Sequence, residues 1–119
     1  MKLIFVYNAK SGLFNTILDI AHKLLSPKSY SCNLCALTYS TFSEQDIWKK
    51  FKSEINIPMT FFHSDEFEAK YGETTFIYPI ILFEHYSGLK TFMSANDINA
   101  IETLEGLIEI IKQKLEVTA

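Results

Sequence analysis

Short apolar runs of the kind found in buried strands alternate along this chain with segments whose apolar residues recur at helical spacing. The first run, Leu3 to Tyr7, is continuous and β-rich, as strands covered on both faces of a sheet usually are. After a break at residues 8–12, a helix that Ser26-Pro27 ends is predicted from one apolar stripe: Phe14, Ile17, Leu18, Ala21, Leu24 and Leu25. The alternation predicts an α/β fold with helices packed on a sheet.

Two further elements are predicted before residue 56. Leu34 to Tyr39 is a second apolar run, which we interpret as a strand parallel to the first. Residues 43–46, Ser-Glu-Gln-Asp, have the composition of a capping box. The helix predicted behind this box carries four apolar residues that we expect to be buried: Ile47, Trp48, Phe51 and Ile55.

The next part of the chain predicts a strand, a short helix and a hairpin. The strand covers residues 59–63. The helix, for which Ser64 or Asp65 is the expected N-cap, runs through Tyr71 and stops at Gly72. Residues 76–83 and 89–93 are separated by a turn-like segment and are predicted to pair as antiparallel strands. These elements give the sheet a mixed character, because hairpin strands are antiparallel and crossover strands are parallel.

The chain closes with helical segments. Residues 94–99 predict a turn or helical start, and Thr103 is placed to cap a last helix. The apolar stripe of that helix is Leu104, Leu107, Ile108, Ile111 and Leu115. The full order is β-α-β-α-β-α-β-β-α, a mixed sheet of about five strands with helices on both faces. With 119 residues, 48% of them hydrophobic, we expect one domain over 1–119.

Charge and hydropathy exclude some partners. The formal net charge is −3, so the chain lacks the basic field that binds phosphate backbones, and we expect no nucleic-acid partner. No apolar run approaches the ~20 residues of a membrane helix, and the opening segment is too short for a signal peptide. These features predict no membrane association and a cytoplasmic location, where cysteines stay reduced or serve redox or metal chemistry.

The predicted order resembles the thioredoxin fold. The likeness is clearest in the C-terminal half, where "EFEAKYG" precedes "YPIILFE", followed by a turn at Ser87-Gly88, a strand and an amphipathic helix. In thioredoxin-like proteins the proline that matches Pro79 is cis and faces the active-site loop. The resemblance therefore implies a role for Pro79 beside a ligand or redox site.

A second likeness is to small, uncharacterised bacterial proteins. The chain is similar to them in a first strand followed by "YNAKSG" and in a later "SP…Y.CNLCALTY". This resemblance implies a bacterial origin and a cytoplasmic location. It implies no reaction.

The two cysteines of the chain, Cys32 and Cys35, are spaced as C-x-x-C, the pattern of thiol–disulfide exchange centres. Such a centre needs a cysteine at a helix N-terminus, where N–H groups and the helix dipole stabilise the thiolate. A strand over residues 34–39 would remove that stabilisation. It would also place both cysteines at the N-terminal end of a parallel strand, opposite the edge where α/β proteins carry their sites.

Metal binding and plain burial are the alternatives for the cysteines. Cys32 and Cys35 supply two of the four ligands that structural zinc needs, and His22 could be a third, so zinc is the cofactor to test. A second C-x-x-C pair is absent from the sequence. The third interpretation is that both are buried free thiols that pack as small hydrophobes.

Two polar segments are further candidates. Asn8, Lys10, Ser11 and Gly12 end a strand and start a predicted helix, so their N–H, hydroxyl and ammonium groups could hold an anion, or simply shape a tight turn. The segment His63-Ser64-Asp65-Glu66 places an imidazole beside carboxylates at a strand end, as a general base or as an ordinary helix cap.

The sequence thus leaves three functions open. The first is a divergent thiol-redox protein that uses Cys32 and Cys35, with Pro79 as an element of the fold. The second is a non-enzymatic anion- or metal-binding module. The third is a domain that only contacts a protein or small-molecule partner.

Overall fold

The computed structural model describes residues 1–8, 33–40, 43–72, 75–86 and 88–118. Among these residues, four strands form one mixed sheet in the order β4-β1-β5-β6. The strands are β1 (Lys2–Tyr7), β4 (Met59–His63), β5 (Ile80–His85) and β6 (Gly88–Met93). Central strand β1 runs parallel to β4 and antiparallel to β5, and β6 is antiparallel to β5.

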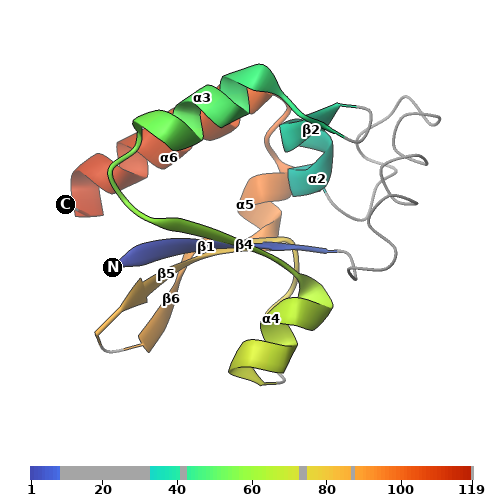
Figure 1. Ribbon diagram of the computed structural model, residues 1–119, viewed down its shortest axis with the longest axis vertical. Helices are drawn as coiled ribbons and strands as arrows, with labels where there is room; N and C mark the ends of the chain where they lie inside the picture. The colour runs from blue at the N-terminus through green and yellow to red at the C-terminus, as the bar shows by residue number, and fades with distance from the viewer. Residues whose placement is uncertain (9–32, 41–42, 73–74, 87, 119) are drawn as a thin grey trace.

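Helices cover both faces of this sheet. Helices α3 (Asp46–Glu54) and α6 (Leu104–Thr118) lie on one face, and α4 (Ser64–Tyr71) lies on the other (Figure 1). This three-layer arrangement explains why Leu3 to Tyr7 read as a continuous apolar run. Successive side chains of β1 point to opposite faces, and both faces are covered.

The alternation of β1 divides the core into two clusters. Leu3, Phe5 and Tyr7 belong to a large cluster under α3 and α6, where the Phe5 ring meets Trp48 edge to face at 5.7 Å. Ile4 and Val6 belong to a smaller cluster under α4, built around Phe67. Every residue from Leu3 to Val6 is completely buried, so β1 contributes side chains to both core clusters.

The prediction of a strand at residues 34–39 is wrong. Residues Asn33–Thr38 form helix α2, and the following Tyr39–Ser40 and Ser43–Glu44 form a small separate ribbon, β2 and β3. Leu34, Leu37 and Thr38 are all buried, which is the i, i+3, i+4 spacing of a helix face. A short apolar run fits both structures, and here tertiary contact favours the helix.

The expected capping box at 43–46 is also wrong, because Ser43 and Glu44 pair with β2 instead. Gln45 occupies the N-cap of α3 without a side-chain cap hydrogen bond, and its Nε2 donates to the Leu37 carbonyl at 3.1 Å. Its backbone N–H donates to the Thr38 carbonyl at 2.9 Å. Within α3 itself, Trp48 and Phe51 are buried as predicted, whereas Ile47 is 43% exposed.

The C-terminal half agrees with most of its predictions. Helix α4 ends before Gly72, whose φ of 86° suits glycine, and the 94–99 segment is helix α5 (Ala95–Asn99). The Thr103 hydroxyl accepts the Gly106 N–H at 3.0 Å, as a cap of α6 should. The hairpin is present, but its first strand begins at Ile80 rather than at residue 76.

The α/β class is therefore confirmed, with four strands in the main sheet of the described residues rather than five. The Tyr78–Pro79 peptide bond is cis. The helix predicted at residues 14–25 lies outside the described residues. Among those that are described, no helix is both long enough and apolar enough to cross a membrane.

We expect Phe67→Ala to lower the free energy of unfolding by about 3–5 kcal/mol, because Phe67 is fully buried at the centre of the cluster under α4. Urea unfolding followed by circular dichroism measures this loss. The matched control is Tyr86→Ala, which removes an aromatic ring that is 98% exposed and should change stability by less than about 0.5 kcal/mol. Equal losses in both variants would contradict the two-cluster core.

Candidate functional site

One edge of the sheet, which we call the carboxyl edge, gathers the ends of several elements. Tyr7 of β1 lies opposite His63 of β4, so the two parallel strands finish side by side. Strand β5 starts there, because Ile80 pairs with Val6, and β6 ends there, because Met93 pairs with Ile81. In α/β sheets, this edge is where ligand and catalytic sites are usually built.

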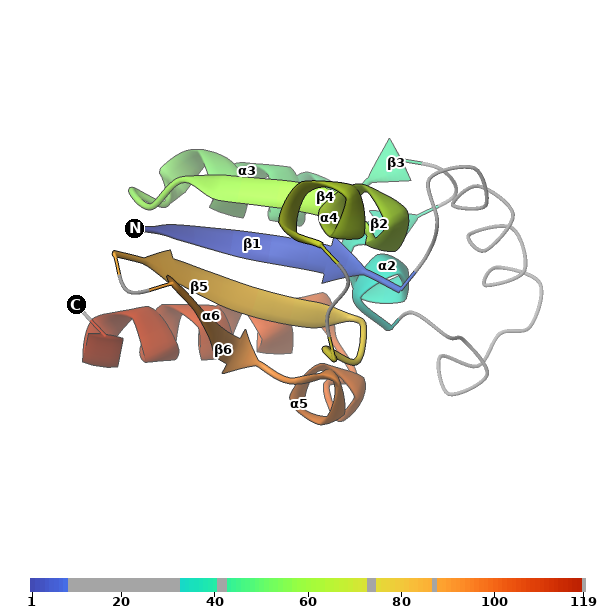
Figure 2. The same cartoon turned by 90° about the horizontal axis from the view of Figure 1, so that it is seen from below.

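Three helices meet at the carboxyl edge. Helix α4 begins directly after His63, and α5 follows the end of β6. Helix α2 contacts α5 and lies beyond the end of β1 (Figure 2). Cys35 is the third residue of α2, so the C-x-x-C segment leads into a helix at the carboxyl edge. The expectation that Cys35 lies at the opposite edge is therefore wrong, because it depended on a strand at 34–39.

The other predicted site residues fall into two groups. Asn8 follows β1 and is half-buried, and Pro79 precedes β5 and is buried, so the backbone brings both to the carboxyl edge. Lys10, Ser11, Gly12, His22 and Cys32 lie outside the described residues. Within the described part of the chain, no group of three or more histidine, cysteine, aspartate or glutamate side chains could hold a metal ion.

His63 is a polar residue at this edge, and both its ring and its backbone contact the same carboxylate. Its Nδ1 lies 2.7 Å from Oε1 of Glu66, and its backbone N–H donates to the same oxygen at 2.8 Å. The ring is 6.0 Å from that of Tyr7, its neighbour across the strands. About a quarter of the His63 side chain is exposed, and Nε2 is buried. The imidazole is thus held in one orientation.

Glu66 is kept ionised by these contacts. The backbone N–H of His63, and then its ring, hold the pKa of Glu66 below the ordinary glutamate value of 4.5, against a smaller effect of burial. Asp65 accepts the Glu66 N–H at 3.0 Å, so the first turn of α4 is closed by its own side chains. A carboxylate bound to one imidazole nitrogen fixes the tautomer, which is what a histidine that moves protons requires.

Sequence reasoning found His63 but left the role of Glu66 open. The signal was present in the spacing, because residues at i and i+3 across a helix start face each other, as in a capping box. Here a histidine takes the N-cap position that serine or threonine usually fills. The expectation that Ser64 or Asp65 is the N-cap is wrong by one or two residues.

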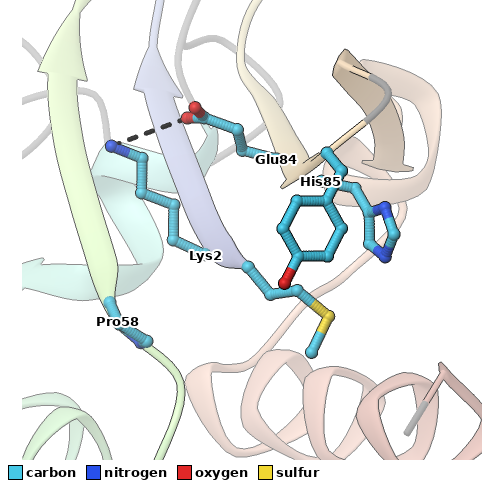
Figure 3. Close-up of a pocket in the computed structure, with 6 residues that line it drawn as sticks. Lys2, Pro58, Glu84 and His85 are labelled. Carbon is cyan, nitrogen blue, oxygen red and sulfur yellow. Dashed lines mark ion pairs between the residues drawn. The ribbon is translucent and has the colours of Figure 1, made fainter.

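A surface pocket of about 420 Å³ lies at the opposite edge of the sheet (Figure 3). Its lining residues are Met1, Lys2, Pro58, Glu84, His85 and Tyr86. Glu84 is engaged twice, by Lys2 Nζ at 3.5 Å and by the Tyr71 hydroxyl at 3.1 Å. Burial, followed by the bond to Glu84, raises the pKa of Tyr71. None of the predicted site residues lines this pocket.

Comparison with known proteins adds no assignment, since neither a family model nor a curated protein nor a solved structure matches the chain.

We expect Glu66→Gln to lower stability at neutral pH by less than about 1 kcal/mol, because the carboxylate is half exposed. The folded pKa of Glu66 is depressed, so its contribution is present above pH 4.5 and disappears as pH falls through the folded value. The gap between wild type and variant should therefore close in acid. Urea midpoints at pH 7, 5, 4 and 3 measure the gap.

The control for this experiment is Glu102→Gln, which makes the same change of net charge at an exposed position between α5 and α6. We expect its urea midpoint to follow that of wild type over the same pH range. A gap for Glu66→Gln that persists unchanged at pH 3 would show that the carboxylate charge has no part in it.

Proposed function

We propose that this chain is a thioredoxin-like thiol–disulfide redox protein that uses Cys32 and Cys35. One observation carries the proposal: residues 33–38 are a helix at the carboxyl edge. The sequence had instead predicted a strand whose first residues, next to the cysteines, would lie at the other edge. Both objections to redox chemistry depended on that strand. Its replacement by α2 removes them together.

The start of α2 is a place where a thiol would be activated. Cys32 immediately precedes the first residue of the helix in the sequence, and Cys35 lies within its first turn. Backbone N–H groups of a first helical turn have no partners within the helix, and they favour negative charge nearby. A thiol in this position is expected to ionise below the ~8.5 of a free cysteine.

The arrangement of the sheet also supports the proposal. The order β4-β1-β5-β6, with β1 parallel to β4 and a hairpin β5–β6 on the other side, is compatible with the thioredoxin-like architecture. Pro79 stands directly before β5 at the carboxyl edge, where the resemblance implies a proline beside the active-site loop. The same resemblances motivate the proposal of a bacterial, cytoplasmic protein of one domain.

The proposed reaction is a two-electron exchange. The thiolate of one cysteine attacks a sulfur of a substrate disulfide, forms a mixed disulfide and releases a thiolate that takes up a proton. The second cysteine then attacks the mixed disulfide. Cys32 and Cys35 end as a disulfide, and the substrate ends as two thiols.

Zinc or anion binding is the alternative function. Zinc would use Cys32, Cys35 and His22, and an anion would use Asn8, Lys10, Ser11 and Gly12. For zinc, a bound ion would protect both cysteines from alkylation until a chelator removed it. The experiment below separates this outcome from redox chemistry.

We expect one of the two thiols to be alkylated by iodoacetamide with a pH midpoint near or below ~7 in the folded protein, because the start of α2 stabilises its thiolate. Mass spectrometry of each cysteine-containing peptide across pH 5 to 10, with and without a chelator, measures both rates. The Cys35→Ser and Cys32→Ser variants identify the reactive thiol and should each fail to form the intramolecular disulfide.

Two results would count against redox chemistry. If both thiols stay unreactive until the protein unfolds, with or without chelator, they are packed as small hydrophobes. If the chelator alone exposes them, the site binds metal.

A further inference from the structure

We propose that the outer side of β4 binds an extended acidic peptide of a partner protein, which joins the sheet as an added strand. The surface, which we call the β4 edge, consists of residues 59–62 and the two lysines that flank them, Lys52 and Lys70. Strand β4 and its neighbours α3 and α4 contain neither cysteine, so this binding is separate from the proposed redox function.

Strand β4 lies at the outside of the sheet, where it pairs with β1 alone among the described residues (Figure 2). On the β1 side, the Leu3 N–H donates to the Pro58 carbonyl at 2.9 Å. Because peptide groups alternate in direction along a strand, the backbone groups of Thr60 and Phe62 also face β1. Those of Met59 and Phe61 face outward, where a further strand can pair with them.

The two outer strands of the described sheet differ in how they resist such pairing. Strand β6 carries the exposed Lys90, and its register with β5 shifts between Ile81 and Leu82. A charged side chain and an irregular register both discourage a further strand. Residues 59–62 of β4, Met-Thr-Phe-Phe, include neither a charge nor a proline, and their pairing with β1 is regular. The β4 edge is therefore the side of the sheet that suits an added strand.

A hollow of about 570 Å³ lies beside the β4 edge. Its apolar lining includes Ile55, Ile57, Met59 and Phe61, which are half-buried against the core cluster under α3 and α6, and Lys52 also lines it. Side chains of an added strand alternate between the two faces of the sheet, so the one opposite Met59 would enter this hollow. The hollow favours an aliphatic side chain at that position of the peptide.

One lysine stands over an aromatic ring on each face of the β4 edge. Lys52 Nζ is 4.8 Å from the centre of the Phe61 ring, which packs on the α3 side, and Lys70 Nζ is 5.7 Å from that of Phe62, which packs on the α4 side. Two successive residues of an added strand, opposite these two rings, would present their side chains to the two ammonium groups. Carboxylates at both positions complement the charge.

The same lysines favour a peptide over a second copy of the chain. Antiparallel pairing of two β4 strands about Phe61 would bring two Lys52 ammonium groups together on one face, and like charges repel. At the end of β4, the Glu66 carboxylate accepts the His63 N–H at 2.8 Å, so it closes the available stretch and repels a third carboxylate. The expected ligand thus has two adjacent acidic residues and an aliphatic residue two positions from one of them.

Fluorescence anisotropy with labelled octapeptides in low salt tests the proposal. The probe TVTEETVT presents the acidic pair and the aliphatic residue in either strand direction. The control TEVTTVET has the same composition with its acidic residues apart, and TVTQQTVT lacks the charge. We expect TVTEETVT to bind, and both controls to bind more weakly by about threefold or more, because they lose the pairing with the two lysines.

Variants of the protein locate the bound peptide. Lys52→Gln and Lys70→Gln should each weaken the binding of TVTEETVT by about two- to fivefold, since each removes one solvent-exposed charge pair. Lys90→Gln, the same loss of charge at the β6 edge, should bind as wild type does. Met59→Pro removes an outward N–H and should abolish binding. If Met59→Pro proves unstable in urea unfolding, the lysine variants carry the comparison.

Hydrogen exchange of the wild type shows whether the peptide pairs with the backbone. We expect TVTEETVT to slow exchange at the amides of Met59 and Phe61, which face outward. Binding without this protection, or binding that both lysine variants leave unchanged, overturns the proposal.

Two further outcomes would also overturn it. The first is the absence of peptide binding up to ~1 mM, the limit of a weak complex. The second is a dimer in sedimentation that Met59→Pro dissociates and Lys90→Gln preserves, without peptide binding, because a second copy of the chain would then occupy the β4 edge.

Discussion

The pairing of β1 with β4 on one side and β5 on the other organises the rest of the structure. Because β1 is central and completely buried from Leu3 to Val6, its register with its neighbours decides which chain ends meet. Parallel pairing brings Tyr7 and His63 to one edge, and antiparallel pairing brings Ile80 to the same edge. The carboxyl edge is thus a product of strand direction, before any side chain contributes chemistry.

The sequence predicted those parts of the fold in which the hydrophobic period agrees with the residues that mark the start or end of an element. Strand β4, helix α4 with its stop at Gly72, and helix α6 with its Thr103 cap all have a clear period and a clear boundary. Helix α2 has neither, since six residues are too few to distinguish a helical stripe from an apolar strand. Contact with α5 and the core decides that segment, and sequence reasoning cannot see tertiary contact.

The same limit governs the candidate site. His63 and the acidic residues behind it were recognisable as a group, but the identity of the partner depended on which residue starts α4. One error, the strand at 34–39, was enough to place Cys35 at the wrong edge and to argue against redox chemistry. A site assembled from strand ends is sensitive to the direction of each element, whereas the core depends mainly on which residues are apolar.

Gln45 joins two parts of the molecule that the sequence presents as separate. Its backbone N–H and side-chain amide hold the last carbonyls of α2, at Thr38 and Leu37, while the residue itself is the N-cap of α3. Helix α3 in turn inserts Trp48 and Phe51 into the core. The end of the cysteine-bearing helix is therefore tied to the start of α3, so a shift of that end at the carboxyl edge either breaks these two hydrogen bonds or carries the start of α3 with it.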